Sequence, residues 1–67
     1  MNKFAERLKE LRLENSLNQT ELGAKLGITQ TGIAKWEVGK RNPSIDSLIA
    51  ISKLFKVSVD YLLGLED

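Results

Sequence analysis

The chain has 67 residues, enough for one domain. A domain of this size buries only about 60% of the surface that its unfolded chain exposes. It contains no cysteine and no histidine, which excludes disulfides, thiolate or imidazole metal sites and the most common catalytic base. A net charge of +1 indicates no particular partner. We therefore expect a single domain over residues 1–67, with no catalytic residues, metal or cofactor.

The charges are unevenly distributed along the chain. Four basic and two acidic residues lie between positions 18 and 43, whereas two basic and four acidic residues follow from position 44. This gives slight support to a polyanionic partner for the central segment. The N-terminus lacks the apolar stretch of a signal peptide, and the longest apolar run is Leu48 to Ile51. We expect a cytoplasmic protein with no membrane partner, and nothing indicates a small-molecule ligand.

Hydrophobic periodicity predicts five helices and no strand. The first helix runs from its cap Asn2 to about Glu14, with Phe4, Leu8 and Leu11 on one face. The others are predicted at 19–26, 30–38, 45–55 and 59–63. The fourth helix is the most apolar, and we expect it to be the central core helix.

Three of these helices begin with the same signal, a polar cap between two apolar residues at the spacing of a hydrophobic staple. The caps are Asn18, Thr29 and Ser58, and Glu21 occupies the capping-box position after the first of them. Ser44 is the predicted cap of the fourth helix. Since each helix is too short to be stable alone, such signals and the burial of one face must define its limits.

The second and third helices, from Gln19 to Glu37, are joined by a tight turn at Gly27. Gly23 is a poor helix former inside the second helix, which suggests close contact with the third helix. The stretch resembles the helix-turn-helix of the Cro/CI-type (XRE) repressor family. The resemblance to that family extends over about residues 4 to 64. The resemblance implies an all-α, five-helix, lambda-repressor-like domain whose third helix, the recognition helix (about 30–38), enters the DNA major groove.

The third helix has separate polar and apolar faces. Ile33 and Trp36 lie on the apolar face, and we expect Trp36 to be partly buried there. On the polar face, Gln30, Thr31 and Lys35 have side chains that can match base edges, so we expect them to contact bases. The alternative is that they are solvated residues of an ordinary amphipathic helix.

Contacts with phosphate are expected from helix starts and nearby cations. These residues are Asn18, Gln19, Lys40 and Arg41. The alternative for Lys40 and Arg41 is a charged, solvated loop.

The resemblance adds two supporting roles. It implies that Gln19 braces Gln30, and that Arg12 pairs with Glu37 in a partly buried ion pair that orients the recognition helix more than it stabilises the fold. Two solvated charges are the alternative for that pair. Gly32 carries no side chain for base contact; it either allows close approach to DNA or has no functional reason.

Specific binding by so small a unit is expected to require a homodimer on two half-sites. Tyr61, Leu63 and Leu65 form the dimer surface or, alternatively, cover the core. We expect sequence-specific binding of double-stranded DNA at a pseudo-palindromic operator and repression of transcription. The alternative function is a protein-interaction module of the same fold without DNA binding. An enzyme has little support because no catalytic pattern is present.

Overall fold

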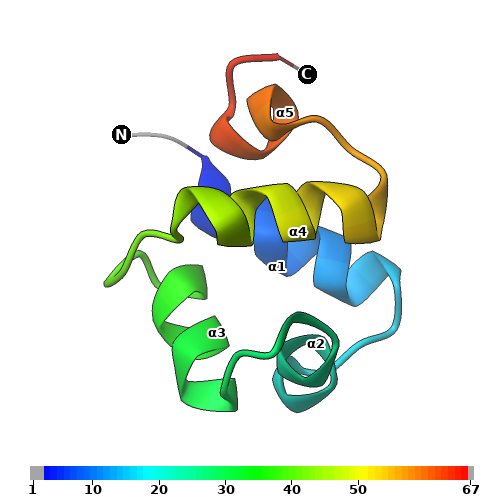
Figure 1. Ribbon diagram of the computed structural model, residues 1–67, viewed down its shortest axis with the longest axis vertical. Coiled ribbons are helices and arrows are strands. Elements are labelled where there is room, and N and C mark those ends of the chain that lie inside the picture. The colour runs from blue at the N-terminus through cyan, green and yellow to red at the C-terminus, as the bar shows by residue number, and fades with distance from the viewer. Residues whose placement is uncertain (1–2, 67) are drawn as a thin grey trace.

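Five helices and no strand make up the regular structure of the computed structural model, which describes residues 3–66. They are α1 (Phe4–Glu14), α2 (Gln19–Leu26), α3 (Gln30–Glu37), α4 (Ile45–Phe55) and α5 (Val59–Leu63) (Figure 1). The all-α, five-helix prediction is confirmed. The predicted cap Asn2 lies outside the described residues, and α1 begins at Phe4. None of the described helices is long and apolar enough to cross a membrane.

Side-chain caps start the helices α2 to α5 at the predicted residues. Asn18 Oδ1 accepts a hydrogen bond from the backbone N–H of Glu21 at 2.7 Å, and Glu21 Oε1 accepts one from the backbone N–H of Asn18 at 2.9 Å. Thr29, Ser44 and Ser58 each accept from the backbone N–H three residues further on. These bonds satisfy donors that have no partner within the helix, so the start of each helix is determined locally.

Helix α1 lies at the centre of the packing, behind α4 in Figure 1, and contacts both α3 and α5. It contributes more buried apolar side chains than any other described helix. The buried core consists of Phe4, Leu8, Leu11, Leu22, Ile33, Trp36, Ile51 and Leu62.

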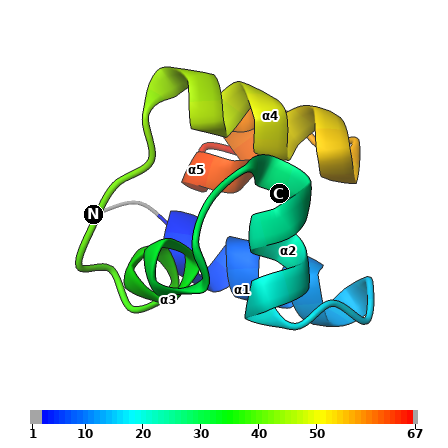
Figure 2. The ribbon, with the colours of Figure 1, turned by 60° about the horizontal axis from the view of Figure 1, so that its bottom comes forward.

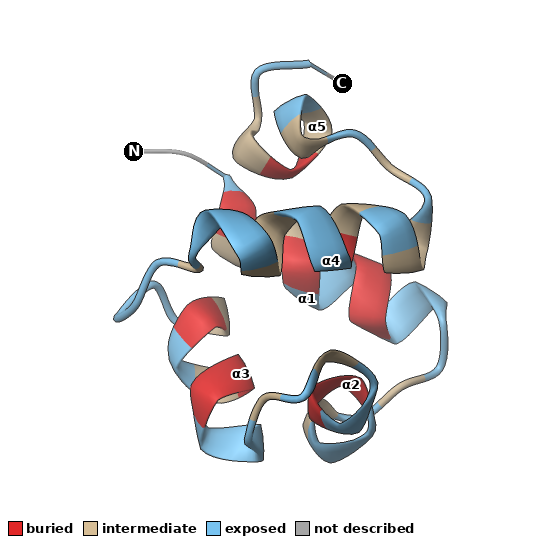
Figure 3. Ribbon diagram, in the orientation of Figure 1, coloured by how far each residue is buried: buried red, intermediate tan, exposed pale blue. Residues whose placement is uncertain are grey.

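The prediction that the fourth helix is the central core helix is wrong. Ile51 is the one buried residue of α4, whereas Ile45 and Ile49 are 76% and 43% exposed. Figure 3 shows much of the outer face of α4 exposed. In so small a domain a peripheral helix is covered on one side only, so its apolar content does not show how central it is.

Two buried side chains attach α3 to the rest of the domain. Ile33 is fully buried, and Trp36 is 4% exposed, which is deeper than the partial burial predicted for it. The Trp36 ring packs edge-on against Phe4 of α1, with the ring centroids 6.1 Å apart. The opposite face of α3 is thereby turned outward.

The turn that connects the end of α2 to the start of α3 (Figure 2) lies against the α2 backbone at Gly23. Gly27 ends α2 in the left-handed conformation, with φ 71°, as predicted. A Cβ atom on Gly23 would lie 2.3 Å from the carbonyl oxygen of Ile28. The close approach predicted at Gly23 is therefore present, but its partner is the turn before α3 and not the third helix itself.

Candidate nucleic-acid interface

The predicted base-contacting residues share one exposed face of α3. Gln30, Thr31 and Lys35 are all exposed, and the exposed residues of α3 are drawn pale blue in Figure 3. Ile33 and Trp36 lie on the opposite, buried face. The helix therefore presents amide, hydroxyl and ammonium groups to solvent along one side, which is the donor and acceptor set that base edges require.

Arg12 and Glu37 form a buried, two-pronged ion pair between α1 and the end of α3. Arg12 Nε donates to Glu37 Oε2 at 2.7 Å and Arg12 Nη2 donates to Glu37 Oε1 at 3.0 Å. The side chains are 10% and 3% exposed. Arg12 Nη1 also donates to the Leu17 carbonyl at 2.9 Å, which ties the pair to the segment before α2. The hydrogen bond with Glu37 raises the pKa of Arg12, against the lowering effect of burial.

A chain of hydrogen bonds leads from this ion pair to the surface. Gln19 Nε2 donates to Glu37 Oε1 at 3.2 Å, and Gln30 Nε2 donates to Gln19 Oε1 at 2.6 Å. The structure thus brings together four residues that the sequence placed in two separate pairs. The link between Gln19 and Glu37 was not predicted, and since they are 18 residues apart no local pattern indicates it.

The direction of every bond in this chain follows from the ion pair. A carboxylate accepts hydrogen bonds only, so Gln19 must turn its amino group to Glu37 and its carbonyl oxygen to Gln30. Gln30 must then donate to Gln19. The carbonyl oxygen and one N–H of Gln30 are not used in this chain, and an amide oxygen and N–H are the acceptor and donor that match the N6 amino group and N7 of adenine.

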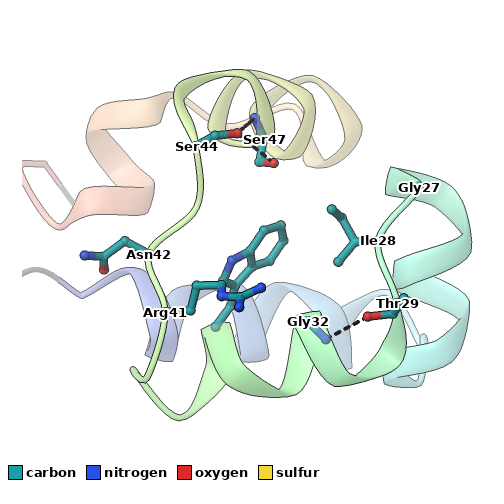
Figure 4. A pocket seen from close by; sticks show the side chains of 9 residues that line it. Gly27, Ile28, Thr29, Gly32, Arg41, Asn42, Ser44 and Ser47 are labelled. Atoms are coloured by element: carbon teal, nitrogen blue, oxygen red, sulfur yellow. Dashed lines mark hydrogen bonds between the residues drawn. The ribbon is translucent and has the colours of Figure 1, made fainter.

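The predicted phosphate-contacting residues lie at two places beside α3. Asn18 and Gln19 are at the start of α2, and the exposed Lys40 and Arg41 are in the loop after α3. The Oδ1 atom and backbone N–H of Asn18 are both used in the capping box, so its Nδ2 group would have to bond a phosphate. Arg41 lines a groove of about 450 Å³ between α3 and the start of α4 (Figure 4).

Comparison with known proteins shows which family has this arrangement of helices. The sequence pattern of the Helix-turn-helix family HTH_3 matches residues 8–62. The chain belongs to the Cro/CI-type helix-turn-helix family.

Relatives of this helix-turn-helix chain include regulators from bacteria and phages. The transcriptional activator BcrR of Enterococcus faecalis is 44% identical over 96% of this chain, which corresponds to 31% of BcrR. Repressor protein C2 of Salmonella phage P22 is 34% identical over 90% of this chain and 28% of that protein. The chain thus spans about a third of the length of these two curated relatives.

The helix-turn-helix fold is also that of a solved repressor. The P22 c2 repressor protein in complex with synthetic operator 9T superposes with a TM-score of 0.87 at 32% identity, over 94% of this chain and 96% of that one. The lambda-repressor-like fold predicted from the resemblance is therefore confirmed.

Gly32 of the helix-turn-helix has a packing role that the sequence left undecided. It is buried, and a Cβ atom there would lie 2.8 Å from Ile28 Cγ2 and 3.4 Å from Thr29 Oγ1. Its backbone N–H donates to Thr29 Oγ1 at 3.1 Å. The missing side chain leaves room for Ile28 beside the cap of α3, which is a packing reason for a glycine here; close approach of its backbone to DNA stays a prediction.

Proposed function

We propose that this chain binds double-stranded DNA sequence-specifically, with α3 in the major groove, and represses transcription at a pseudo-palindromic operator. The main support is the exposed Gln30, held at the end of a hydrogen-bond chain that starts from a buried ion pair. An amide held in one orientation loses less entropy on binding and discriminates base edges better than a free one. The P22 c2 protein, which has the same fold, forms a complex with a synthetic operator.

In this proposal the residues around α3 divide into two groups. Gln30, Thr31 and Lys35 contact base edges and determine sequence preference. The residues of the second group contact phosphates and so position the domain on the duplex, but phosphate contacts do not distinguish one base sequence from another. This second group comprises Asn18, Gln19, Lys40 and Arg41.

We also propose that the domain acts as a homodimer in the cytoplasm. Two copies related by a two-fold axis would contact half-sites about one helical turn apart. Leu65 is 73% exposed and is available for such a contact. Tyr61 is half-buried, with the Arg7 guanidinium 4.2 Å above its ring, so it contributes to packing against α1 as well.

Selection from a random library of duplexes tests the proposed function. The protein should enrich one sequence with two-fold symmetry, and the spacing of its halves should match one turn of DNA or a multiple of it. Failure to enrich any sequence would contradict the proposal and favour a protein-interaction module of the same fold.

Substitution of Gln30 should reduce discrimination between sequences. For Gln30→Ala we expect the preference for the selected operator over random DNA to fall by about 1 to 3 kcal/mol, because the bidentate match to adenine is lost. Affinity for random DNA should change little. Binding titrations on both duplexes measure the two effects, and equal losses on both would mean that Gln30 contacts no base.

Substitution of Arg41 should weaken binding to all sequences. Arg41→Ala removes one phosphate contact, so the slope of log affinity against log salt should decrease by about one. Arg41→Lys keeps the charge and should keep the slope. The exposed Lys9 of α1 provides a control, Lys9→Ala, for the loss of a charge away from α3. If Arg41→Ala and Lys9→Ala changed the slope equally, Arg41 would make no specific phosphate contact.

A further inference from the structure

Val38 is an apolar residue at the C-cap of α3, directly after the last helical residue Glu37. Its side chain is 67% exposed, and its backbone N–H donates to the Ala34 carbonyl at 3.1 Å, so it continues the helical path as the C-cap. At about 100° per residue from Gln30, Val38 falls near 80° and Lys35 near 140°. Val38 therefore stands in the middle of the exposed arc, although it was not among the predicted site residues.

Val38 continues a line of methyl-bearing side chains on this side of the helix, of which Thr31 is exposed and Ala34 half-buried. Thr31, Ala34 and Val38 have the spacing i, i+3 and i+7, which places them on one side of the helix. With a rise of about 1.5 Å per residue the line is roughly 10 Å long, or about three base-pair steps of 3.4 Å. Gln30 and Lys35 lie on either side of it. The face therefore combines polar groups with a strip of methyl groups.

Among the groups that base pairs present in the major groove, the C5-methyl of thymine is the apolar one. Val38 has no donor or acceptor in its side chain, so it can form no hydrogen bond with phosphates or polar base edges. Its exposed methyl groups gain free energy only by burial against another apolar group. Its place beside Gln30 and Lys35 makes DNA the partner that this side of the helix would meet.

We propose that Val38 is a specificity-determining residue that packs against a thymine methyl and extends base recognition from the start of α3 to its end. This rests on the proposed function, since it requires α3 to lie in the major groove.

A thymine-to-uracil scan of the selected operator tests the contact, because uracil lacks only the 5-methyl group. Affinities are measured for the unaltered protein, for Val38→Ala and for Leu13→Ala, which shortens a 57% exposed residue of α1. At one thymine of each half-site, uracil should weaken binding by about fourfold for the unaltered protein and for Leu13→Ala. The same uracil should have no effect on Val38→Ala.

Two results would overturn the proposal, and they distinguish failure of the thymine contact from failure of DNA binding. If the protein selects an operator but each uracil changes binding of Val38→Ala and of the unaltered protein equally, the thymine contact is wrong and DNA binding stands. If no duplex is selected, the proposed function fails and the thymine contact fails with it. Should Val38→Ala lose its helical circular dichroism, Val38→Thr, which keeps the side-chain shape and one methyl group, replaces it and should show a reduced uracil effect.

Discussion

Replacement of Arg12 by methionine is expected to lower the free energy of unfolding by about 3 to 5 kcal/mol. The change leaves the carboxylate of Glu37, in a side chain that is 3% exposed, without its guanidinium partner. A buried charge without a countercharge costs far more than the pair contributes, and the remaining hydrogen bond from Gln19 supplies no countercharge. Unfolding in urea, followed by circular dichroism, measures the loss. A decrease below about 1 kcal/mol would mean that the pair behaves as an exposed one.

The double variant Arg12→Met/Glu37→Met separates stability from orientation. Two apolar side chains of similar size can replace a buried ion pair at little or no cost, so we expect the stability to return to within about 1 kcal/mol of the original. Discrimination between operator and random DNA should not return, because Gln19 has lost the carboxylate that directs its amide. A double variant with full discrimination would show that the hydrogen-bond chain has no part in base recognition.

Replacement of Gly23 by alanine is expected to be the second most damaging change. A Cβ atom at 2.3 Å from the Ile28 carbonyl oxygen cannot be accommodated unless the backbone of the turn moves. Alanine gains about 0.5 to 1 kcal/mol in helix propensity, but overpacking against backbone costs about 1 to 3 kcal/mol. We therefore expect a net decrease in the free energy of unfolding. The loss in the free energy of operator binding should be larger than this decrease, because α3 is displaced relative to α2.

Gly32→Ala is the matched control for this prediction. It also adds one methyl group to a buried helical glycine of the same motif, but the nearest atom is a side-chain methyl of Ile28 at 2.8 Å. The Ile28 side chain can shift more readily than a backbone carbonyl group, but Cγ2 is attached directly to Cβ, so the gain in helix propensity should offset only part of the cost. We therefore expect Gly32→Ala to lose less stability than Gly23→Ala. Thermal unfolding and operator titration of both variants provide the comparison. If Gly23→Ala were as well tolerated as Gly32→Ala, the turn would be looser than its contacts indicate.

The limits of the helices could be predicted because their causes are local. Asn18, Thr29, Ser44 and Ser58 are capping residues in the sequence and caps in the structure, since a cap bonds an N–H only three residues away. The exposed side of α3 was predictable for the same reason. Its polar and apolar residues separate at helical spacing, and the apolar ones must be buried.

The position of α4 and the hydrogen-bond chain could not be predicted in this way. An apolar stripe shows that a helix packs against something, but not that α1 occupies the centre while Ile45 and Ile49 stay outside. The family resemblance indicated the pairs Arg12–Glu37 and Gln19–Gln30 but no link between them. In the structure the hydrogen bond from Gln19 Nε2 to Glu37 Oε1, at 3.2 Å, joins the two pairs.

The sequence alone thus determined which segments are helical, where they start and which side of α3 faces outward, because these depend on neighbours within a few residues. The tertiary structure decided which helix is central and how the Gln30 amide is turned. Both depend on contacts between residues far apart in the chain. The direction of the Gln30 amide follows from the buried carboxylate of Glu37, which lies two hydrogen bonds away through Gln19 and can only accept.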